Sequence, residues 1–107
     1  MKLESVDSPI TIGSGNIDLG DALRTHAEES IRKVGAKYFG RITMASAHFN
    51  REGTDFRCSV NIQMGALPKV SGEAQAKDAT AAFDAAIEKV AKQLRRSKRE
   101  LRDDKVH

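Results

Sequence analysis

The chain lacks most of the patterns that mark catalysis, metal binding or membrane insertion. It has a single cysteine, Cys58, which excludes an internal disulfide and fits a reducing compartment. It contains no Cys-x-x-Cys or His-Glu-x-x-His motif and no phosphate-binding glycine loop. No apolar run approaches the roughly 20 residues that span a bilayer, and the acidic start has no apolar core typical of a secretory signal. We therefore expect a cytoplasmic protein that is not an enzyme, with no metal, cofactor, small-molecule substrate or membrane partner.

Aromatic residues are also scarce, with four phenylalanines, one tyrosine and no tryptophan. Stacking platforms for single-stranded bases are therefore not expected. What the chain does have is concentrated positive charge. Residues 89–102 hold seven basic residues and one acidic residue, a net +6, whereas the whole chain carries only +3. Clustered cations favour binding to several phosphates at once, because each contact releases counterions. The alternative for this cluster is an ordinary solvated helix face.

Residues 78–102 show the period of an amphipathic helix, around which the rest of the chain is organised. The apolar residues share one narrow face at 100° per residue: Phe83, Ile87, Val90, Leu94 and Leu101. Basic residues recur on the side turned away from that face: Lys89, Lys92, Arg96 and Arg99. We expect the helix to end at Arg102 and residues 103–107 to form a frayed tail.

A further helix is predicted over residues 21–38. Its apolar positions again follow a 3.6-residue period: Leu23, Ala27, Ile31, Val34 and Tyr38. Gly20 is the expected N-cap, and Asp21 places negative charge where the helix dipole favours it. Gly35 is expected to weaken the last turn, so that the helix ends early. A side stripe of this helix carries His26, Lys33 and Lys37.

Four segments alternate between apolar and polar residues, as half-buried strands do: residues 9–13, 41–50, 55–64 and 69–75. The alternation is clearest in the third, where Cys58 falls on the apolar side as a small core residue. Turns are predicted at residues 51–54 and 65–68.

This order, β-α-β-β-β-α, predicts an α+β fold in which two helices pack on one face of a four-stranded sheet. The first two strands are expected to be parallel and the last three to form a meander, which leaves the opposite face polar and open. The chain reads as a single domain, residues 1–107, in which residues 1–8 form a loose leader.

The ordered segments resemble the ribosome hibernation-promoting factors, also called ribosome-associated inhibitors. The resemblance covers about residues 9–102 and is carried by ITIGSGNIDLGDALRTH, KYFGRI and GEAQAKDATAAFDAAIEKVAKQLRRSKRE. It departs at Thr80, where the family often has an aromatic residue, and we expect the Phe83 ring to fill that space.

The resemblance implies a stress or stationary-phase factor without chemistry of its own. Such a factor binds the small ribosomal subunit, and so the whole ribosome, in the channel used by mRNA and tRNA. The expected rRNA-binding residues are Arg24, Lys33, Lys37, Lys89, Lys92, Arg96, Lys98 and Arg99, with Arg95 and Arg102 as lesser candidates. Asn61 and Gln63 are further polar candidates.

Long members of that family carry a further domain that pairs two ribosomes, so ribosome dimerisation is not expected from this chain alone. Whether the chain is a short form or the first domain of a long form stays open. Two other functions fit the same residues. One is a general module for structured RNA, and the other is a protein-interaction domain that uses the open sheet face.

Overall fold

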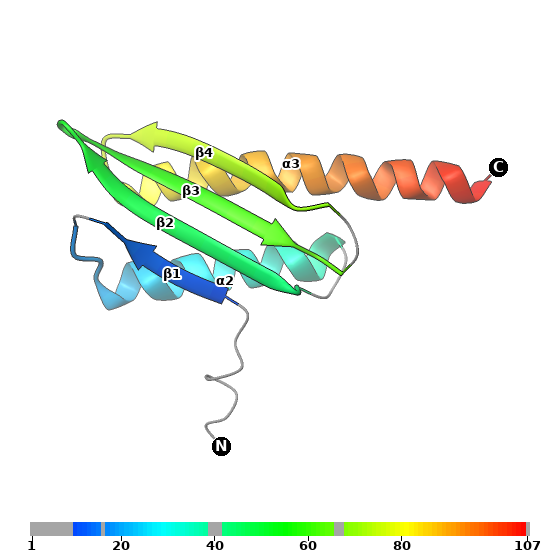
Figure 1. Ribbon diagram of the computed structural model, residues 1–107, viewed down its shortest axis with the longest axis horizontal. Coiled ribbons are helices and arrows are strands. Elements are labelled where there is room, and N and C mark those ends of the chain that lie inside the picture. The colour runs from blue at the N-terminus through cyan, green and yellow to red at the C-terminus, as the bar shows by residue number, and fades with distance from the viewer. Residues whose placement is uncertain (1–9, 16, 39–41, 66–67, 107) are drawn as a thin grey trace, which may run out of the picture.

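The chain forms a four-stranded sheet with two helices. The computed structural model describes residues 10–15, 17–38, 42–65 and 68–106, with the side chains of these residues except 38 and 98–106. The elements along the chain are β1 (Ile10–Ser14), α2 (Asp21–Tyr38), β2 (Met44–Glu52), β3 (Asp55–Gln63), β4 (Val70–Ala76) and α3 (Ala79–Val106) (Figure 1). The predicted order and α+β fold class are confirmed.

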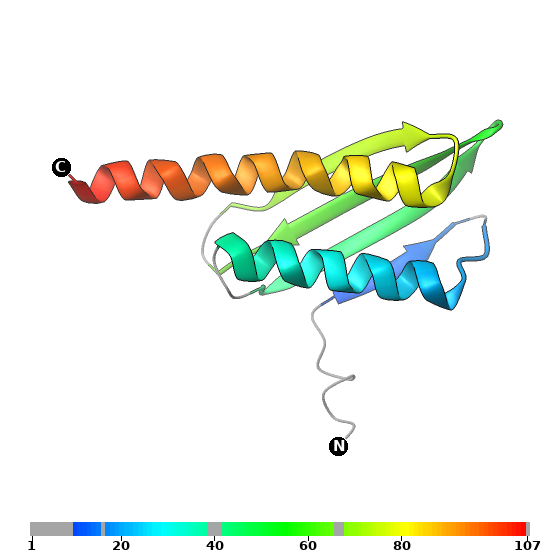
Figure 2. The same ribbon diagram turned by 180° about the vertical axis from the view of Figure 1, so that it is seen from behind.

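The strands lie in the sheet in their order along the chain, β1-β2-β3-β4. β1 pairs with β2 in parallel, and β2, β3 and β4 form an antiparallel meander, as predicted. Both helices cover the same face of the sheet and lie side by side (Figures 1 and 2). They run in the same direction, and the last turns of α3 extend beyond the sheet (Figure 2).

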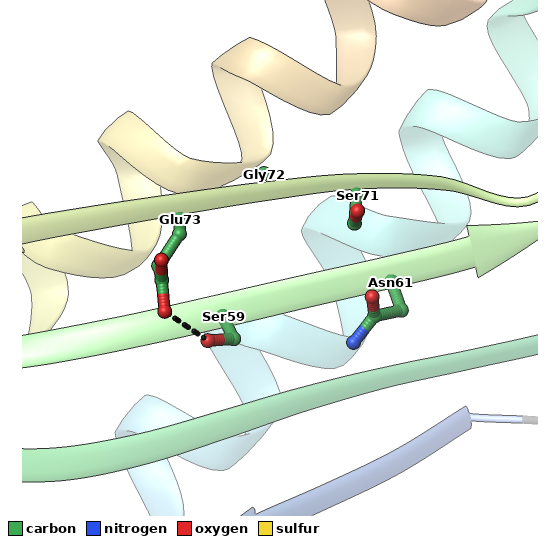
Figure 3. A pocket seen from close by; sticks show the side chains of 5 residues that line it. All are labelled: Ser59, Asn61, Ser71, Gly72 and Glu73. Atoms are coloured by element: carbon green, nitrogen blue, oxygen red, sulfur yellow. Dashed lines mark hydrogen bonds between the residues drawn. The ribbon is translucent and has the colours of Figure 1, made fainter.

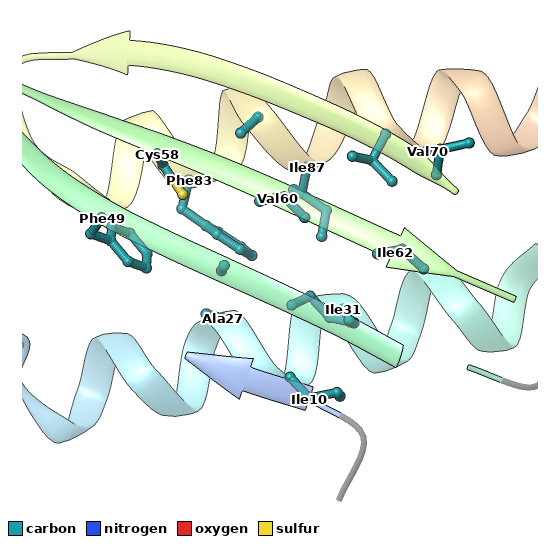
Figure 4. Packing of buried hydrophobic residues seen from close by; sticks show 14 of the residues in the cluster. Ile10, Ala27, Ile31, Phe49, Cys58, Val60, Ile62, Val70, Phe83 and Ile87 are labelled. Atoms are coloured by element: carbon teal, nitrogen blue, oxygen red, sulfur yellow. The ribbon is translucent and has the colours of Figure 1, made fainter. Parts of the chain in front are cut away.

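The core fills the layer between the sheet and the helices (Figure 4). Phe49 from β2 and Phe83 from α3 are fully buried and stack with ring centroids 6.2 Å apart. Cys58 on β3 lies in the same layer, where burial raises the pKa of its thiol to about 12. The predicted role of Cys58 as a core residue is therefore confirmed, and its thiol is kept in the protonated, unreactive form at neutral pH.

Two helix ends differ from the sequence prediction. α2 continues through Gly35 to Tyr38 and does not end early. A Cβ on Gly35 would lie 2.7 Å from Cδ1 of Ile42, so a larger residue here would require the Ile42 side chain to shift. α3 continues to Val106 instead of ending at Arg102, and the predicted frayed tail is helical over residues 103–106.

The strand bounds differ by a few residues. β2 begins at Met44 and not at residue 41, which lies outside the described residues, as do residues 1–9 of the predicted leader and first strand. The hairpin between β2 and β3 is also tighter than predicted. Its pairing runs to Glu52 and Asp55, and Gly53, with a φ of 63°, turns the chain in two residues.

Candidate nucleic-acid interface

The orientation of α3 follows from its cap and its apolar face. Oδ1 of Asp78 accepts a hydrogen bond of 2.7 Å from the backbone N–H of Ala81, so Asp78 is the N-cap and α3 begins one residue later. Phe83, Val90 and Leu94 are at most 2% exposed, which confirms the predicted apolar face over the described side chains. The opposite side of the helix is therefore presented to solvent.

The exposed side of α3 carries the cations. Lys92 lies two turns and a half beyond Phe83, which places it about opposite the core. Lys92, Arg95 and Arg96 are all exposed, and none of them forms an ion pair with another described side chain. The side chains of Lys98 and Arg99 lie outside the described residues, so the structure leaves their predicted role untested.

The second half of α2 adds further exposed cations. Lys33 and Lys37 lie four residues apart and both are exposed, whereas Ala27 and Ile31 face the core. Because α2 and α3 run in the same direction, their second halves point toward the same end of the molecule (Figure 2). Arg32 is also exposed on this half of α2. The sequence prediction omits it, although its charge and its place beside Lys33 were a usable signal.

Two predicted phosphate ligands form hydrogen bonds with the sheet. Nη1 of Arg24 donates a 3.2 Å hydrogen bond to the carbonyl of Ile12 in β1. Nζ of Lys89 donates a 2.7 Å hydrogen bond to the carbonyl of Glu73 in β4. Both strands are edges of the sheet, so these cations satisfy backbone acceptors that no neighbouring strand reaches.

His26 joins the two helices. Its Nε2 lies 2.8 Å from Oδ1 of Asp84 on α3, and its ring packs edge-on against Phe83 with centroids 5.6 Å apart. The sequence placed His26 in a basic stripe with two lysines, but the structure gives it a contact between helices. This contact bridges the two cation-bearing helices.

The open sheet face has a different character. Arg57 forms ion pairs with Glu73 at 3.0 Å and with Glu52 at 3.3 Å, and Ser59 also donates to Glu73. The pKa of the Glu73 carboxyl is lowered, first by the hydrogen bond from Arg57 and next by that from Ser59. A shallow hollow on this face is lined by Ser59, Asn61, Ser71, Gly72 and Glu73 (Figure 3). Asn61 and Gln63 thus lie on the opposite side of the sheet from the basic helices.

The structure offers little support for other chemistry. Among the side chains that it describes, no three of the types His, Cys, Asp and Glu gather closely enough to hold a metal ion. Within the same residues, no helix has the length and apolar character needed to cross a membrane. The exposed cations of α2 and α3 remain the most distinctive functional feature.

The family model described as sigma 54 modulation protein / S30EA ribosomal protein matches residues 10–102. The chain belongs to this family. The S30EA family is ribosome-associated, so the resemblance to hibernation factors noted in the sequence is confirmed at the level of the family.

A named relative of this S30EA chain agrees with the family assignment. The chain is 30% identical over 96 residues to the ribosome hibernation promotion factor of Rhizobium meliloti (strain 1021), over 88% of this chain and 50% of that protein. It therefore spans about half the length of that relative.

Two solved structures share the fold. The N-terminal domain of Thermus thermophilus Protein Y has a TM-score of 0.71 at 22% identity, over 80% of this chain and 93% of that one. A ribosomal subunit interface protein from Coxiella burnetii has a TM-score of 0.72 at 18% identity, over 83% of this chain and 96% of that one.

Proposed function

We propose that this chain is a ribosome-hibernation module that acts in the cytoplasm by occupying the mRNA and tRNA channel of the small ribosomal subunit. Its exposed helical cations would bind rRNA phosphates there and so block translation without any chemical step. The observation that carries the proposal is the cluster of Lys92, Arg95 and Arg96, exposed and without described carboxylate partners, on a chain of the S30EA family.

Charge and shape favour phosphate binding over base recognition. The cations stand on one continuous helix, about 42 Å long over its 28 residues. Among the described phenylalanines, Phe49 and Phe83 are fully buried, and Phe56 is partly buried with Arg51 over its ring, so they offer little surface for base stacking. Binding of this kind depends strongly on salt, because each neutralised phosphate releases counterions.

The test is co-sedimentation with purified small subunits, large subunits and whole ribosomes at low and raised salt. The proposal predicts pelleting with small subunits and whole ribosomes, and less pelleting when mRNA and tRNA already occupy the channel. Equal binding to large subunits and to unrelated structured RNA would instead identify a general RNA-binding module. Absence of pelleting at low salt would contradict the proposal.

A matched pair of single variants tests whether the exposed side of α3 is the surface that binds rRNA. Lys92→Gln removes one exposed cation from α3, whereas Lys77→Gln removes one exposed cation that precedes this helix. We expect Lys92→Gln to lower the slope of log affinity against log salt by about one, the value for one phosphate contact. Lys77→Gln should leave the slope unchanged, and an equal effect of both variants would argue against a defined basic interface.

A further inference from the structure

α3 approaches β4 closely at Gly72. A Cβ on Gly72 would lie 2.5 Å from the carbonyl oxygen of Ala86 and 2.9 Å from Cβ of Lys89. Real Cβ atoms do not tolerate such distances, so only glycine permits this approach. The close approach sets the height of α3 above the sheet at the turn that carries Lys89.

Two side chains of α3 then reach the outer edge of β4. Nζ of Lys89 donates to the carbonyl of Glu73, and Nε2 of Gln93 donates to the carbonyl of Ser71, both at 2.7 Å. The donors are four residues apart on the helix, a rise of about 6 Å. The acceptors are two residues apart on the strand, a rise of about 7 Å, so their carbonyls point the same way. The two spacings match, and the pair fixes the position of α3 along β4.

The same helix is held on its other side by α2. Asp84 contacts His26 across the helix pair at 2.8 Å, while Lys89 and Gln93 hold the side that faces β4. At 100° per residue, Lys92 falls between the Asp84 side and the Lys89 side, away from the sheet. Contacts on both sides oppose rotation of α3 about its axis, and they keep Lys92 turned outward.

We propose that Lys89 is a positioning residue that works with Gln93, and that it is not one of the phosphate ligands. The two side chains attach α3 to the edge of β4 and thereby orient Lys92, Arg95 and Arg96. This inference rests on the proposed binding of rRNA by α3, but it assigns Lys89 a role that its charge alone would not predict. On this proposal the charged Lys89 and the neutral Gln93 have the same role, which is to donate a hydrogen bond to a backbone carbonyl of β4.

The test separates the charge of Lys89 from its hydrogen bond. Lys89→Gln keeps an amide donor of the kind that Gln93 already uses one turn later, whereas Lys89→Met keeps the side-chain bulk and loses the donor. Gln93→Met is the matched loss at the second attachment. Small-subunit affinity is measured for each variant across a salt series, and thermal unfolding is measured without ribosomes.

We expect Lys89→Gln to retain the salt slope of the unmodified protein, whereas Lys92→Gln lowers it by about one. Lys89→Met and Gln93→Met should both lower the unfolding temperature and weaken binding at an unchanged slope. The proposal is overturned if Lys89→Gln lowers the slope as much as Lys92→Gln does. It is also overturned if Lys89→Met unfolds at the temperature of the unmodified protein.

The unfolding measurement keeps this inference separate from the proposed function. If the unmodified protein fails to bind small subunits, the proposed function fails. The role of Lys89 and Gln93 in attaching α3 to β4 is then tested by the unfolding temperatures alone. Retained stability in Lys89→Gln with a loss in both methionine variants supports it, and equal stability in all three variants overturns it.

Discussion

The two faces of this molecule handle charge in opposite ways. On the open sheet face, Arg57 is paired with both Glu52 and Glu73, and Gln75 donates to Asp55 at 3.2 Å. On α3, the exposed cations Lys92, Arg95 and Arg96 have no described carboxylate partners. A cation that is already paired with carboxylates, as Arg57 is, gains little from an anionic partner. Like charges that gather without partners repel one another, and an anionic surface relieves that repulsion.

The largest expected effect on stability comes from removing a side chain that packs between α3 and the sheet. Leu94 is 2% exposed in the layer between α3 and the sheet. Leu94→Ala should lower the free energy of unfolding by about 2–5 kcal/mol, because it removes buried surface and leaves a cavity. Urea unfolding measures the change, with Lys92→Ala as an exposed control expected to stay within about 0.5 kcal/mol. A stable Leu94→Ala variant would contradict the burial of this side chain.

A smaller loss of stability is expected at Gly72, where β4 and α3 are in close contact. Gly72→Ala places a Cβ against the backbone of α3 and should cost about 1–3 kcal/mol, the usual range for overpacking. Gly13→Ala on β1 is the control, because its Cβ would meet His48 at an ordinary 3.8 Å. Equal unfolding midpoints for the two variants would show that α3 shifts to accommodate the methyl group.

The contrast between the faces can be tested directly by binding. Changing Lys92, Arg95 and Arg96 together to glutamine should lower the salt slope for small-subunit binding by about three and weaken affinity roughly tenfold or more. Arg57→Gln on the sheet face should leave the slope unchanged, because its charge is already paired. If Arg57→Gln weakened binding more than the triple variant, the sheet face would be the interface.

The smallest effect concerns pH on the sheet face. Because the pKa of Glu73 is lowered in the folded protein, its contribution to stability is present above the ordinary carboxyl value of about 4.3. It is lost as the pH falls through the lowered folded value. The stability difference between the unmodified protein and Glu73→Gln should therefore be largest near neutral pH and shrink in acid. Glu29→Gln on α2 is the exposed control. A difference that stays constant with pH would argue against the Arg57 contact.

Local periodicity was sufficient to predict the fold. The alternation that predicted β3 places Cys58, Val60 and Ile62 in the core, and the helical period of α3 places Phe83, Val90 and Leu94 there. Each pattern depends on residues within one element, so no knowledge of distant contacts was needed. The end of α3 was missed because its apolar period stops while no glycine or proline follows to end the helix.

The site was less predictable, because its contacts join residues far apart in the sequence. His26 and Asp84 are 58 positions apart, and Lys89 and Glu73 are 16 apart on different elements. From charge alone, Lys89 and Lys92 look equivalent, yet one reaches a strand carbonyl and the other is directed to solvent. The close contact at Gly35 likewise involves Ile42, a residue outside the helix whose position the helical pattern does not predict.

The contacts of Arg24, Lys89 and Gln93 also bear on how copies of the chain behave toward one another. An edge strand with unpaired carbonyls is a template on which another chain can add a strand and begin to aggregate. Here the seven-residue β4 has two of its carbonyls occupied by α3 side chains, and β1 has one occupied by Arg24. Helix side chains therefore occupy outward-facing carbonyls on both edges of the sheet, which leaves fewer acceptors there for a strand of another chain.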